Sequence, residues 1–581
     1  MALSVEANMA HTRRWVGIAL SGLVAVSLCL GASDRALAAS TGTEVLDWKV
    51  SGSVEAGGMY SFGERGSSKF NEYRDMDNGF VGELELKAEK KDSPYHFEIG
   101  VKNPARDDQM YEGAFGQYGL FRLDLGWDRT PHVLSNNAQT MFQQSGGNFT
   151  IPSSLRNTIT TTPAGYLAGK PGNTYCTGIT SWTCPYPVGT STAPTVGNAQ
   201  FNFINGTING LLRPVSLGFN TDEGYMGFKL TPTEALRFDV EYTNRRVEGS
   251  RAASAVLNNP VELPIPIDQM TQEVKVGAEF AVSSFAFQVG YTGSIFRNEY
   301  QSYMWDNPNS TVSQSNIAGV RTAASAMGEV SAAPDNIAHT LNLTARGSLP
   351  WWRTNLSGAF SYTMLRQDDT FVNNIATPGP GLTQRNTDDS GRSSADAKAN
   401  LVAGNILLTS RPINSVTMTA RYRYFEYQND MPNHIFTNDV TPSGLWNGVT
   451  SNTTKNERYT KQNAGIDIGW RPIRMVSFKA GYEYEHWNRG DFDDKSFETS
   501  EHILKAAVDV TPINWLLGRL TYTYGVRDLS DDYGQDPNSG VGFYKFNYAD
   551  RVRNRADFLL QFSPWETLTP SINFGYANDN F

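Results

Sequence analysis

Polar and apolar residues alternate along many stretches of the chain. In VSFKAGYEYE (476–485), one parity is apolar or aromatic and the other is polar: Val476, Phe478, Ala480, Tyr482 and Tyr484 against Ser477, Lys479, Gly481, Glu483 and Glu485. Successive side chains of a β-strand point to opposite faces. The pattern therefore predicts a strand with one apolar face and one charged face.

The same alternation recurs along the chain. It occupies residues 80–89, 95–101, 121–127, 236–242, 274–280, 285–291, 341–346, 416–424, 464–470, 516–524 and 551–562. Each run is about ten residues long, which is the length of a tilted strand that crosses a membrane. The repetition predicts an all-β chain.

Two kinds of connection join these runs. Short links with a proline recur at 230–236, 348–354, 410–416, 470–476, 510–516 and 562–568, and we interpret them as proline turns. Long polar stretches occupy 298–334, 368–394, 430–456 and 528–545. Short turns at one end and long loops at the other are typical of an outer-membrane barrel.

A sheet that crosses a bilayer must close on itself, because lipid satisfies no backbone hydrogen bond. We therefore expect residues 39–581 to form a large antiparallel transmembrane β-barrel of about 18–28 strands, with short periplasmic turns and long extracellular loops. Its apolar face would contact outer-membrane lipid. A soluble β-sandwich or a propeller would also alternate, but strand length, loop asymmetry and export favour the barrel.

The N-terminus has the features of an export signal. Arg13 and Arg14 precede an apolar stretch at 15–31, and Ala36-Leu37-Ala38 fits a cleavage site. A membrane anchor is the alternative, but the stretch is shorter than the ~20 residues a span needs. We predict that residues 1–38 are a cleaved signal peptide and that the mature protein reaches the outer membrane of a Gram-negative bacterium.

Residues 129–213 interrupt the alternation. They are rich in Gly, Pro, Thr and Ser, and we predict a long loop that is extracellular or folded into the lumen, with an interdomain linker as the alternative. Cys176 and Cys184 lie in this segment. In an oxidising compartment they are a candidate disulfide. A redox or metal pair is the alternative, but no histidine is near and the spacing is not CxxC.

Composition and motifs narrow the function. The net charge is −10, and cleavage of the signal removes three basic and two acidic residues to give −11, which argues against a nucleic-acid partner. The seven histidines form no metal-ligand spacing, and no CxxCH or nucleophile motif occurs. We expect no catalysis, no metal site and no cofactor held by this chain.

The charged parity would face the lumen. A barrel of ~20 strands would have a backbone diameter near ~40 Å, wide enough to house a polypeptide. A polar lining is expected of any water-filled pore. The sharper hypothesis is that charged rows contact a partner inside, and the candidate contacts are Glu83, Glu85, Glu98, Arg421, Arg423, Lys479, Glu483, Glu485, Arg551, Arg553 and Arg555.

Five segments carry a resemblance to a known family. They are residues 51–86 with KFNEYRD, NFTIPSSL (148–155), YTNRRVEGSR (242–251), LPIPIDQMTQEVKVGAEF (263–280) and YEYEHWNRGD (482–491). The chain resembles the MtrB/PioB family of decahaem-associated outer-membrane proteins. The resemblance implies a barrel that sheathes a periplasmic multihaem c-type cytochrome for electron transfer across the outer membrane. The haem would belong to that partner, and an extracellular cytochrome is a further expected partner.

Other functions stay open at this point. A porin-like diffusion channel for small solutes would use 129–213 as its constriction, and an adhesin would use the long loops. The chain also departs from the family pattern, since some members carry an N-terminal CxxC that is missing here. At the other end, 568–581 would be an outward-going strand although Phe581 looks like a terminal assembly signal. Either the strand count is off by one, or the sequence lacks its last strands.

Overall fold

The computed structural model describes residues 43–45, 47–61, 67–155, 209–257, 259–306, 327–373, 386–437, 451–492, 495–530, 549–564 and 567–581. The predicted signal peptide (1–38) and the candidate disulfide between Cys176 and Cys184 lie outside these ranges. Among the described residues, no helix is both long enough and apolar enough to cross a bilayer.

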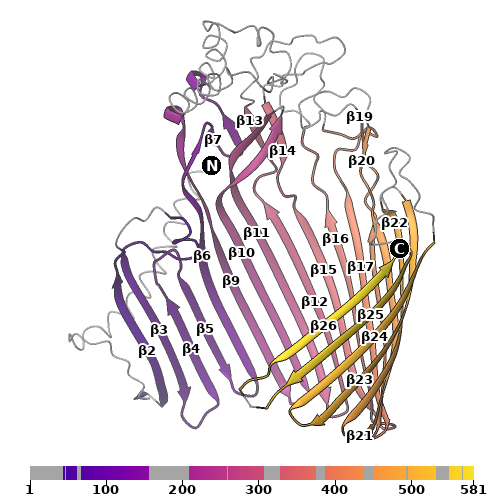
Figure 1. Ribbon diagram of the computed structural model, residues 1–581. Coiled ribbons are helices and arrows are strands. Elements are labelled where there is room, and N and C mark those ends of the chain that lie inside the picture. The colour runs from indigo at the N-terminus through magenta and orange to yellow at the C-terminus, as the bar shows by residue number, and fades with distance from the viewer. Residues whose placement is uncertain are drawn as a thin grey trace, which may run out of the picture.

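The alternating segments form one 20-stranded antiparallel sheet in which each strand pairs with the next one along the chain (Figure 1). Its strands are β1 (Thr43–Val45), β2 (Trp48–Met59), β3 (Gly79–Lys90), β4 (Tyr95–Lys102), β5 (Met110–Gln117), β6 (Phe121–Thr140), β9 (Arg213–Thr233), β10 (Leu236–Leu257), β11 (Asn259–Val282), β12 (Phe285–Asn298), β15 (Asn336–Leu349), β16 (Thr354–Gln367), β17 (Ala397–Ile413), β18 (Val416–Asn429), β21 (Arg458–Ile473), β22 (Val476–Phe492), β23 (Lys495–Ile513), β24 (Leu516–Leu529), β25 (Arg551–Phe562) and β26 (Ser571–Asn580). The predicted alternating runs all lie in these strands.

The sheet curves into the wall of a barrel (Figure 1). Short turns lie along its lower edge in this view, and the strand ends that lead into the long connections lie along its upper edge. The all-β barrel with short periplasmic turns and long extracellular loops is therefore confirmed.

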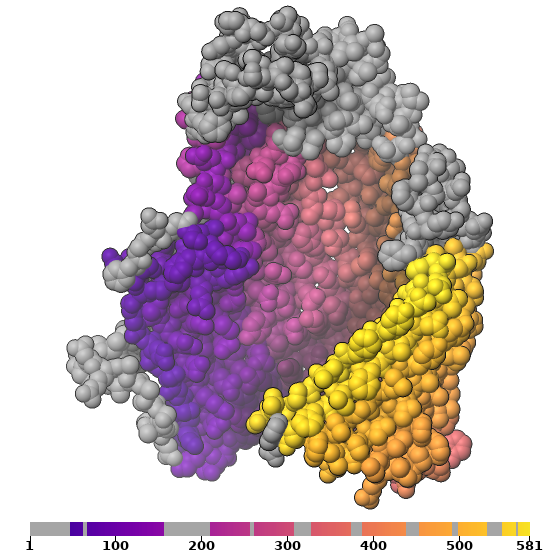
Figure 2. All heavy atoms as spheres, viewed as in Figure 1, coloured from indigo at the N-terminus to yellow at the C-terminus, as the bar shows by residue number. Residues whose placement is uncertain are grey.

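Two strands keep an unpaired edge within the described residues. β26 pairs with β25 alone. β2 pairs with β3 on one side, and on its other side only Trp48–Val50 pair with the short β1. Both strands run from the turn end to the loop end, as predicted for residues 568–581. Figure 2 shows the opening between the indigo and yellow strands, through which the inner face of the wall is visible.

Several strands are longer than the sequence predicted. β9, β10 and β11 contain 21, 22 and 24 residues. A strand needs only ~9–11 residues to cross the hydrocarbon region. These strands are therefore about twice as long as a membrane crossing requires.

In four of the six short links the proline lies in a bulge beside the turn, whereas Pro350 and Pro564 lie in the connections themselves. The register shifts between Ser410 and Ile413, and the hairpin then closes over residues 414–415. The same shift occurs between Trp470 and Ile473 and between Val510 and Ile513. Proline has no backbone N–H to donate, so a bulge tolerates it where a regular ladder does not. The predicted proline turns therefore hold at 348–354 and 562–568, and at the other four links the proline lies one or two residues before the turn.

The predicted loop at 129–213 also begins later and ends earlier than expected. β6 continues to Thr140, and its upper part pairs with β9 from Arg213 onward, with register shifts near Ser135. Pro131, Asn136 and Asn137 hid the strand because proline and asparagine are depleted in strands. Residues 156–208 of the predicted loop lie outside the described ranges.

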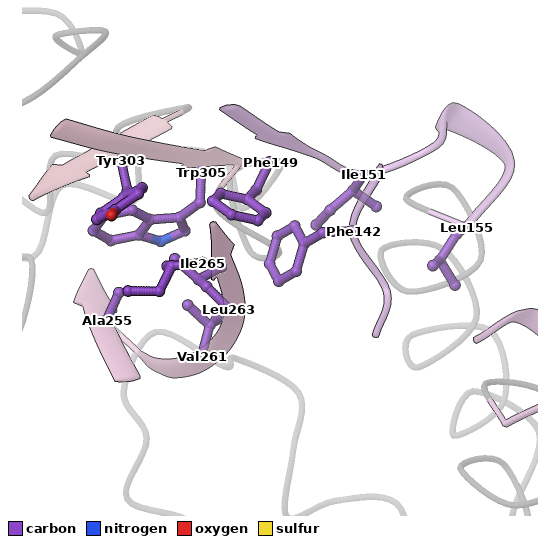
Figure 3. Packing of buried hydrophobic residues seen from close by; sticks show 10 residues of the cluster. All are labelled: Phe142, Phe149, Ile151, Leu155, Ala255, Val261, Leu263, Ile265, Tyr303 and Trp305. Carbon is purple, nitrogen blue, oxygen red and sulfur yellow. The ribbon is translucent and has the colours of Figure 1, made fainter. Parts of the chain in front are cut away.

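A separate small core lies at the loop end. A second sheet contains β7 (Gln143–Ser145), β8 (Asn148–Thr150), β13 (Ser302–Asp306) and β14 (Met327–Ser331), and β19 (Ile435–Thr437) pairs with β20 (Ser451–Thr453). A short 3-10 helix, η3 (Asn209–Leu211), precedes β9. Figure 3 shows the buried cluster, which we call the apical core: Phe142, Phe149, Ile151, Leu155, Ala255, Val261, Leu263, Ile265, Tyr303 and Trp305.

The apical core joins segments far apart in the chain. Phe149 and Ile151 come from NFTIPSSL, while Leu263 and Ile265 come from LPIPIDQM, and the four pack in one cluster. The backbone N–H of Ile151 also donates to Oδ2 of Asp306 at 2.7 Å. The wall exposes its large apolar side chains on the lipid-facing surface. The apical core instead buries its apolar side chains against one another, as the core of a soluble domain does.

Candidate partner-binding lumen

Register places the charged residues of neighbouring strands on one face of the wall. Arg421 on β18 is opposite Gly465 on β21, and Asp467, two residues further along β21, is opposite Gly481 on β22. The side chains of Arg421 and Asp467 therefore lie on the same face of the sheet. The other face carries exposed aromatic and aliphatic side chains, such as Phe478 and Tyr482. Because lipid must contact the apolar face, the charged face is the lumen side.

Arg421 is the centre of an ion-pair ladder across four strands. Its guanidinium donates to Asp467 on β21 and to Oε2 of Glu483 on β22 at 3.0 Å. Lys505 on β23 donates to the same Glu483 oxygen at 2.8 Å. The predicted contacts Arg421 and Glu483 are therefore brought together and satisfy each other.

The neighbouring rows show the same arrangement. Glu485 accepts from Nε1 of Trp487 at 2.8 Å and forms an ion pair with Lys461 at 3.1 Å. Lys479 lies 2.9 Å from Asp509, which also accepts from Arg519.

The arginine row of β25 is also paired within the wall. Arg551 lies 2.6 Å from Glu501, and Arg553 lies 2.7 Å from Asp579. Arg555 pairs with the next lumen-facing residue of its own strand, a carboxylate at 2.8 Å. Arg551 and Arg553 thus stabilise contacts between strands.

Near the N-terminus, Glu98 on β4 lies 3.0 Å from Arg122 and 3.9 Å from Lys87. Most of the predicted contact residues are therefore engaged in the wall. Glu83, Glu85 and Arg423 differ: all are exposed, and within the described residues none of them has an ion-pair partner. Contact of any of these residues with a partner stays a prediction.

Sequence reasoning missed an aromatic stack on the lumen face. Tyr459 lies between Phe425 and Trp487, with ring centroids 5.6 and 5.7 Å away. The cations of Lys461 and Arg489 lie 4.3 and 4.4 Å from the Trp487 ring. The stack crosses three strands, so its only sequence signal was aromatic residues on the polar parity of each strand.

A shallow hollow lies beside this stack on the lumen wall. Its volume is about 540 Å³, and it spans β15 to β21. Small side chains such as Ala359, Ser361 and Ala403 form its floor, and Phe425 and Arg423 line one side. Short side chains bring the wall surface closer to the backbone here.

A buried acid–histidine pair fastens two loops above the wall. His434 Nδ1 lies 2.8 Å from Oδ2 of Asp388, and its Nε2 lies 2.9 Å from the carbonyl oxygen of Ala395. Both partners are acceptors, so the ring satisfies both only when both nitrogens carry hydrogen. Burial acts to raise the pKa of Asp388, but hydrogen bonds from His434 and from the backbone amides of Arg392 and Ser390 outweigh it, and the pKa lies below its ordinary value.

Among the described residues, no three His, Cys, Asp or Glu side chains gather in a way that could hold a metal ion.

The curved antiparallel wall, apolar outside and charged inside, defines an outer-membrane β-barrel protein. The sequence model of the family described as "Putative outer membrane beta-barrel porin, MtrB/PioB" matches residues 64–581. The chain belongs to this MtrB/PioB family, and its location is the outer membrane.

A curated relative agrees with this assignment. "Outer membrane protein MtrB" of Shewanella baltica (strain OS185) is 23% identical over 552 residues, which cover 92% of this chain and 68% of the relative.

Solved structures show weaker similarity. The closed form of the ferric-catecholate import receptor Fiu from E. coli K12 has a TM-score of 0.34 at 11% identity, covering 85% of this chain and 68% of that one. The siderophore receptor PiuA from Acinetobacter baumannii has a TM-score of 0.34 at 8% identity, covering 92% and 77%. Similarity at this level does not establish a shared architecture.

Proposed function

We propose that this protein is a non-catalytic sheath that holds a periplasmic multihaem c-type cytochrome in its lumen, so that electrons cross the outer membrane. The observation that carries the proposal is a lumen face lined by charge in a member of the MtrB/PioB family. The haems of the partner carry the electrons, and the barrel positions and insulates them.

The width of the wall supports this role. A barrel of ~20 strands leaves a bore of about 25–30 Å after side chains are added, whereas a helix with its side chains is only ~10–12 Å across. Ion pairs such as Arg421–Glu483 and Arg553–Asp579 neutralise lumen charges within the wall. A folded guest can therefore lie against this surface without leaving many buried charges unpaired.

The test is purification followed by reconstitution. The barrel is extracted in mild detergent, and haem is measured per barrel in the purified complex. Liposomes that contain the complex are expected to reduce an external acceptor from an internal donor, while liposomes with the barrel alone do not. A barrel that purifies without any haem protein, and liposomes that never reduce the acceptor, would contradict the proposal.

A porin-like channel for small solutes is the second candidate, because the matched family is described as a porin. It predicts large and steady conductance in planar bilayers from the protein as isolated. Conductance that appears only after a partner is stripped off would favour the sheath.

A further inference from the structure

An aromatic belt marks the upper limit of the lipid-facing surface. Six strands that run from the turn end to the loop end carry an aromatic side chain on the lipid-facing parity at their seventh residue: Trp127, Tyr242, Tyr291, Tyr422, Tyr482 and Tyr522. Because the short turns lie along one edge of the wall (Figure 1), these side chains lie at a similar height above it. Girdles of tyrosine and tryptophan are typical of the interface between membrane and water.

Just above the belt, the lipid-facing parity becomes charged. On β10, Arg246 is two lipid-facing positions beyond Tyr242 and donates to both carboxylate oxygens of Asp268 on β11, at 3.0 and 2.8 Å. On β6 and β9, Arg129 and Asp222 form a second pair at 3.7 Å. With ~3.3 Å per residue and a strand tilt of ~40°, Arg246 lies ~25 Å above the start of β10, which is the height of the apolar band of a barrel. Since charges are expensive in hydrocarbon, the bilayer ends below Arg246.

The apical core lies well above this boundary. Its residues on β10 and β11 belong to the part of the hairpin farthest from the turn. Ile265 is paired with Arg251, and Val261 is paired with Ala255. The same rise and tilt place these pairs ~38 and ~48 Å above the start of β10. The apical core is therefore outside the bilayer, ~13–23 Å beyond the level of Arg246.

The second sheet lies on the lumen side of the wall. β11 is paired with β10 along almost its whole length without a register shift, so every second residue keeps the same face. Leu263 and Ile265 therefore point to the same side as Lys275, which forms an ion pair with Glu241 at 3.2 Å on the charged face. Both leucine and isoleucine pack in the apical core against side chains of β8 and β13 (Figure 3). The second sheet thus overhangs the lumen.

Buried contacts hold the second sheet against the wall. The hydroxyl of Tyr303 on β13 donates to the carbonyl oxygen of Pro266 on β11 at 2.9 Å, and Tyr303 is 5% exposed. Phe149 and Trp305 are buried in the same cluster. A sheet fastened by a buried hydrogen bond and by close packing keeps one position over the lumen.

The second sheet by itself narrows the outer mouth. Packed sheets lie ~10 Å apart, and side chains on the far face add ~5 Å. The second sheet then extends ~15 Å from the wall into a barrel whose backbone diameter is near ~40 Å. Once the side chains of the opposite wall are included, the free width falls from about 25–30 Å in the bore to ~20 Å at the outer mouth.

We infer that the apical core is a rigid cap outside the bilayer, which overhangs the lumen and sets the size limit at its outer mouth. A solute or a guest that fills the bore is stopped beneath the cap. The inference goes beyond the proposed function, because it holds for a sheath and for a channel alike. Neither test below measures haem, so its failure is distinct from failure of the sheath.

The first test locates the apical core relative to the bilayer. The protein is reconstituted with lipids brominated on their acyl chains, which quench tryptophan fluorescence within the hydrocarbon region. Trp305→Phe keeps an aromatic ring in the core and should leave the quenched intensity unchanged. The matched control is Trp470→Phe, which should lower the quenched intensity because Trp470 is 50% exposed on the lipid-facing side. A loss of quenched intensity in Trp305→Phe would overturn the inference.

The second test compares the widths of the two mouths. The barrel, freed of any haem protein, is inserted into a planar bilayer, and polyethylene glycol ~24 Å in diameter, between the two estimated widths, is added to one side at a time. The polymer should lower the current from the turn side and leave it unchanged from the loop side. In Phe149→Ala it should lower the current from both sides, whereas Phe70→Ala, whose ring is 57% exposed, should behave as the wild type does. An equal effect from both sides of the wild type would overturn the inference, whether or not Phe149→Ala folds.

Discussion

The apical core offers the sharpest test of the packing at the loop end. Phe149 on β8 is 0% exposed, and its backbone is paired in parallel with Trp305 of β13. Phe142 packs edge-on against it with ring centroids 6.3 Å apart (Figure 3). Replacing Phe149 by alanine removes most of this buried surface and leaves a cavity.

The expected cost of Phe149→Ala is about 3–5 kcal/mol, the range for a buried phenylalanine. If the apical core opens as a unit, protection of its amides falls at least ~100-fold, since 1.4 kcal/mol is a factor of ten. The amide of Met304 is a suitable reporter because it donates to the carbonyl oxygen of Gly147 at 2.9 Å. Hydrogen exchange with mass spectrometry measures the change.

Phe70→Ala is the matched control, because that ring is 57% exposed. It should alter stability by no more than ~0.5 kcal/mol and the protection of Met304 by less than ~threefold. Both variants should keep the mobility of a folded barrel on unheated gels, since the wall does not depend on the apical core. Unchanged protection of Met304 in Phe149→Ala would refute the reasoning.

Three further predictions concern the wall and the loops above it. A Cβ at Gly52 would lie 2.1 Å from a backbone oxygen, whereas nothing lies within 4 Å at Gly58, so Gly52→Ala should lower the folded fraction on unheated gels and Gly58→Ala should not. Arg421→Gln should lower the denaturation midpoint more than Arg423→Gln, because only Arg421 bridges carboxylates of two other strands, a loss of roughly 0.5–2 kcal/mol. Because the pKa of Asp388 is depressed in the folded protein, its ionised carboxylate stabilises the loop at pH values above ~3.9, the ordinary pKa of an aspartate. This contribution is lost as the pH falls through the folded pKa, and amide exchange of residues 386–396 should detect the loss.

Equal folded fractions of the two glycine variants would contradict the register of the wall. A larger fall of the denaturation midpoint in Arg423→Gln than in Arg421→Gln would contradict it as well. In the variant Asp388→Asn, amide exchange of residues 386–396 should no longer show the acid transition of the wild type, because asparagine does not titrate. A transition that persists in the variant would place its origin in another group.

Local sequence determined the strands and their faces. Alternation over 476–485 predicts which side chains of β22 face lipid and which face the lumen, because period-two alternation is a property of one strand alone. The resemblance segments also indicated the family before the fold was known. At four of the six short links the proline lies in a bulge one or two residues before the turn, because both a bulge and a turn accommodate a residue without a backbone N–H.

Partners across strands could not be predicted in the same way. Arg421 and Glu483 lie on β18 and β22 with β21 between them, and their contact depends on the register of two hairpins. Register follows from bulges and connection lengths, each of which shifts a neighbour by whole residues. For this reason the charged rows were predicted as surfaces for a partner, whereas most of them pair with each other.

The sequence by itself therefore determined a β-barrel with an apolar exterior and a charged interior, because these follow from residues one and two positions apart. Only the tertiary structure decided which lumen charges remain without an ion pair within the described residues, such as Glu83 and Glu85, and which distant segments meet in the apical core. Phe149 and Leu263 are more than a hundred residues apart in the sequence, and they share one cluster because the second sheet, with β8 and β13, packs against β11 of the wall. Long-range packing of this kind has no local periodicity, so no pattern along the chain records it.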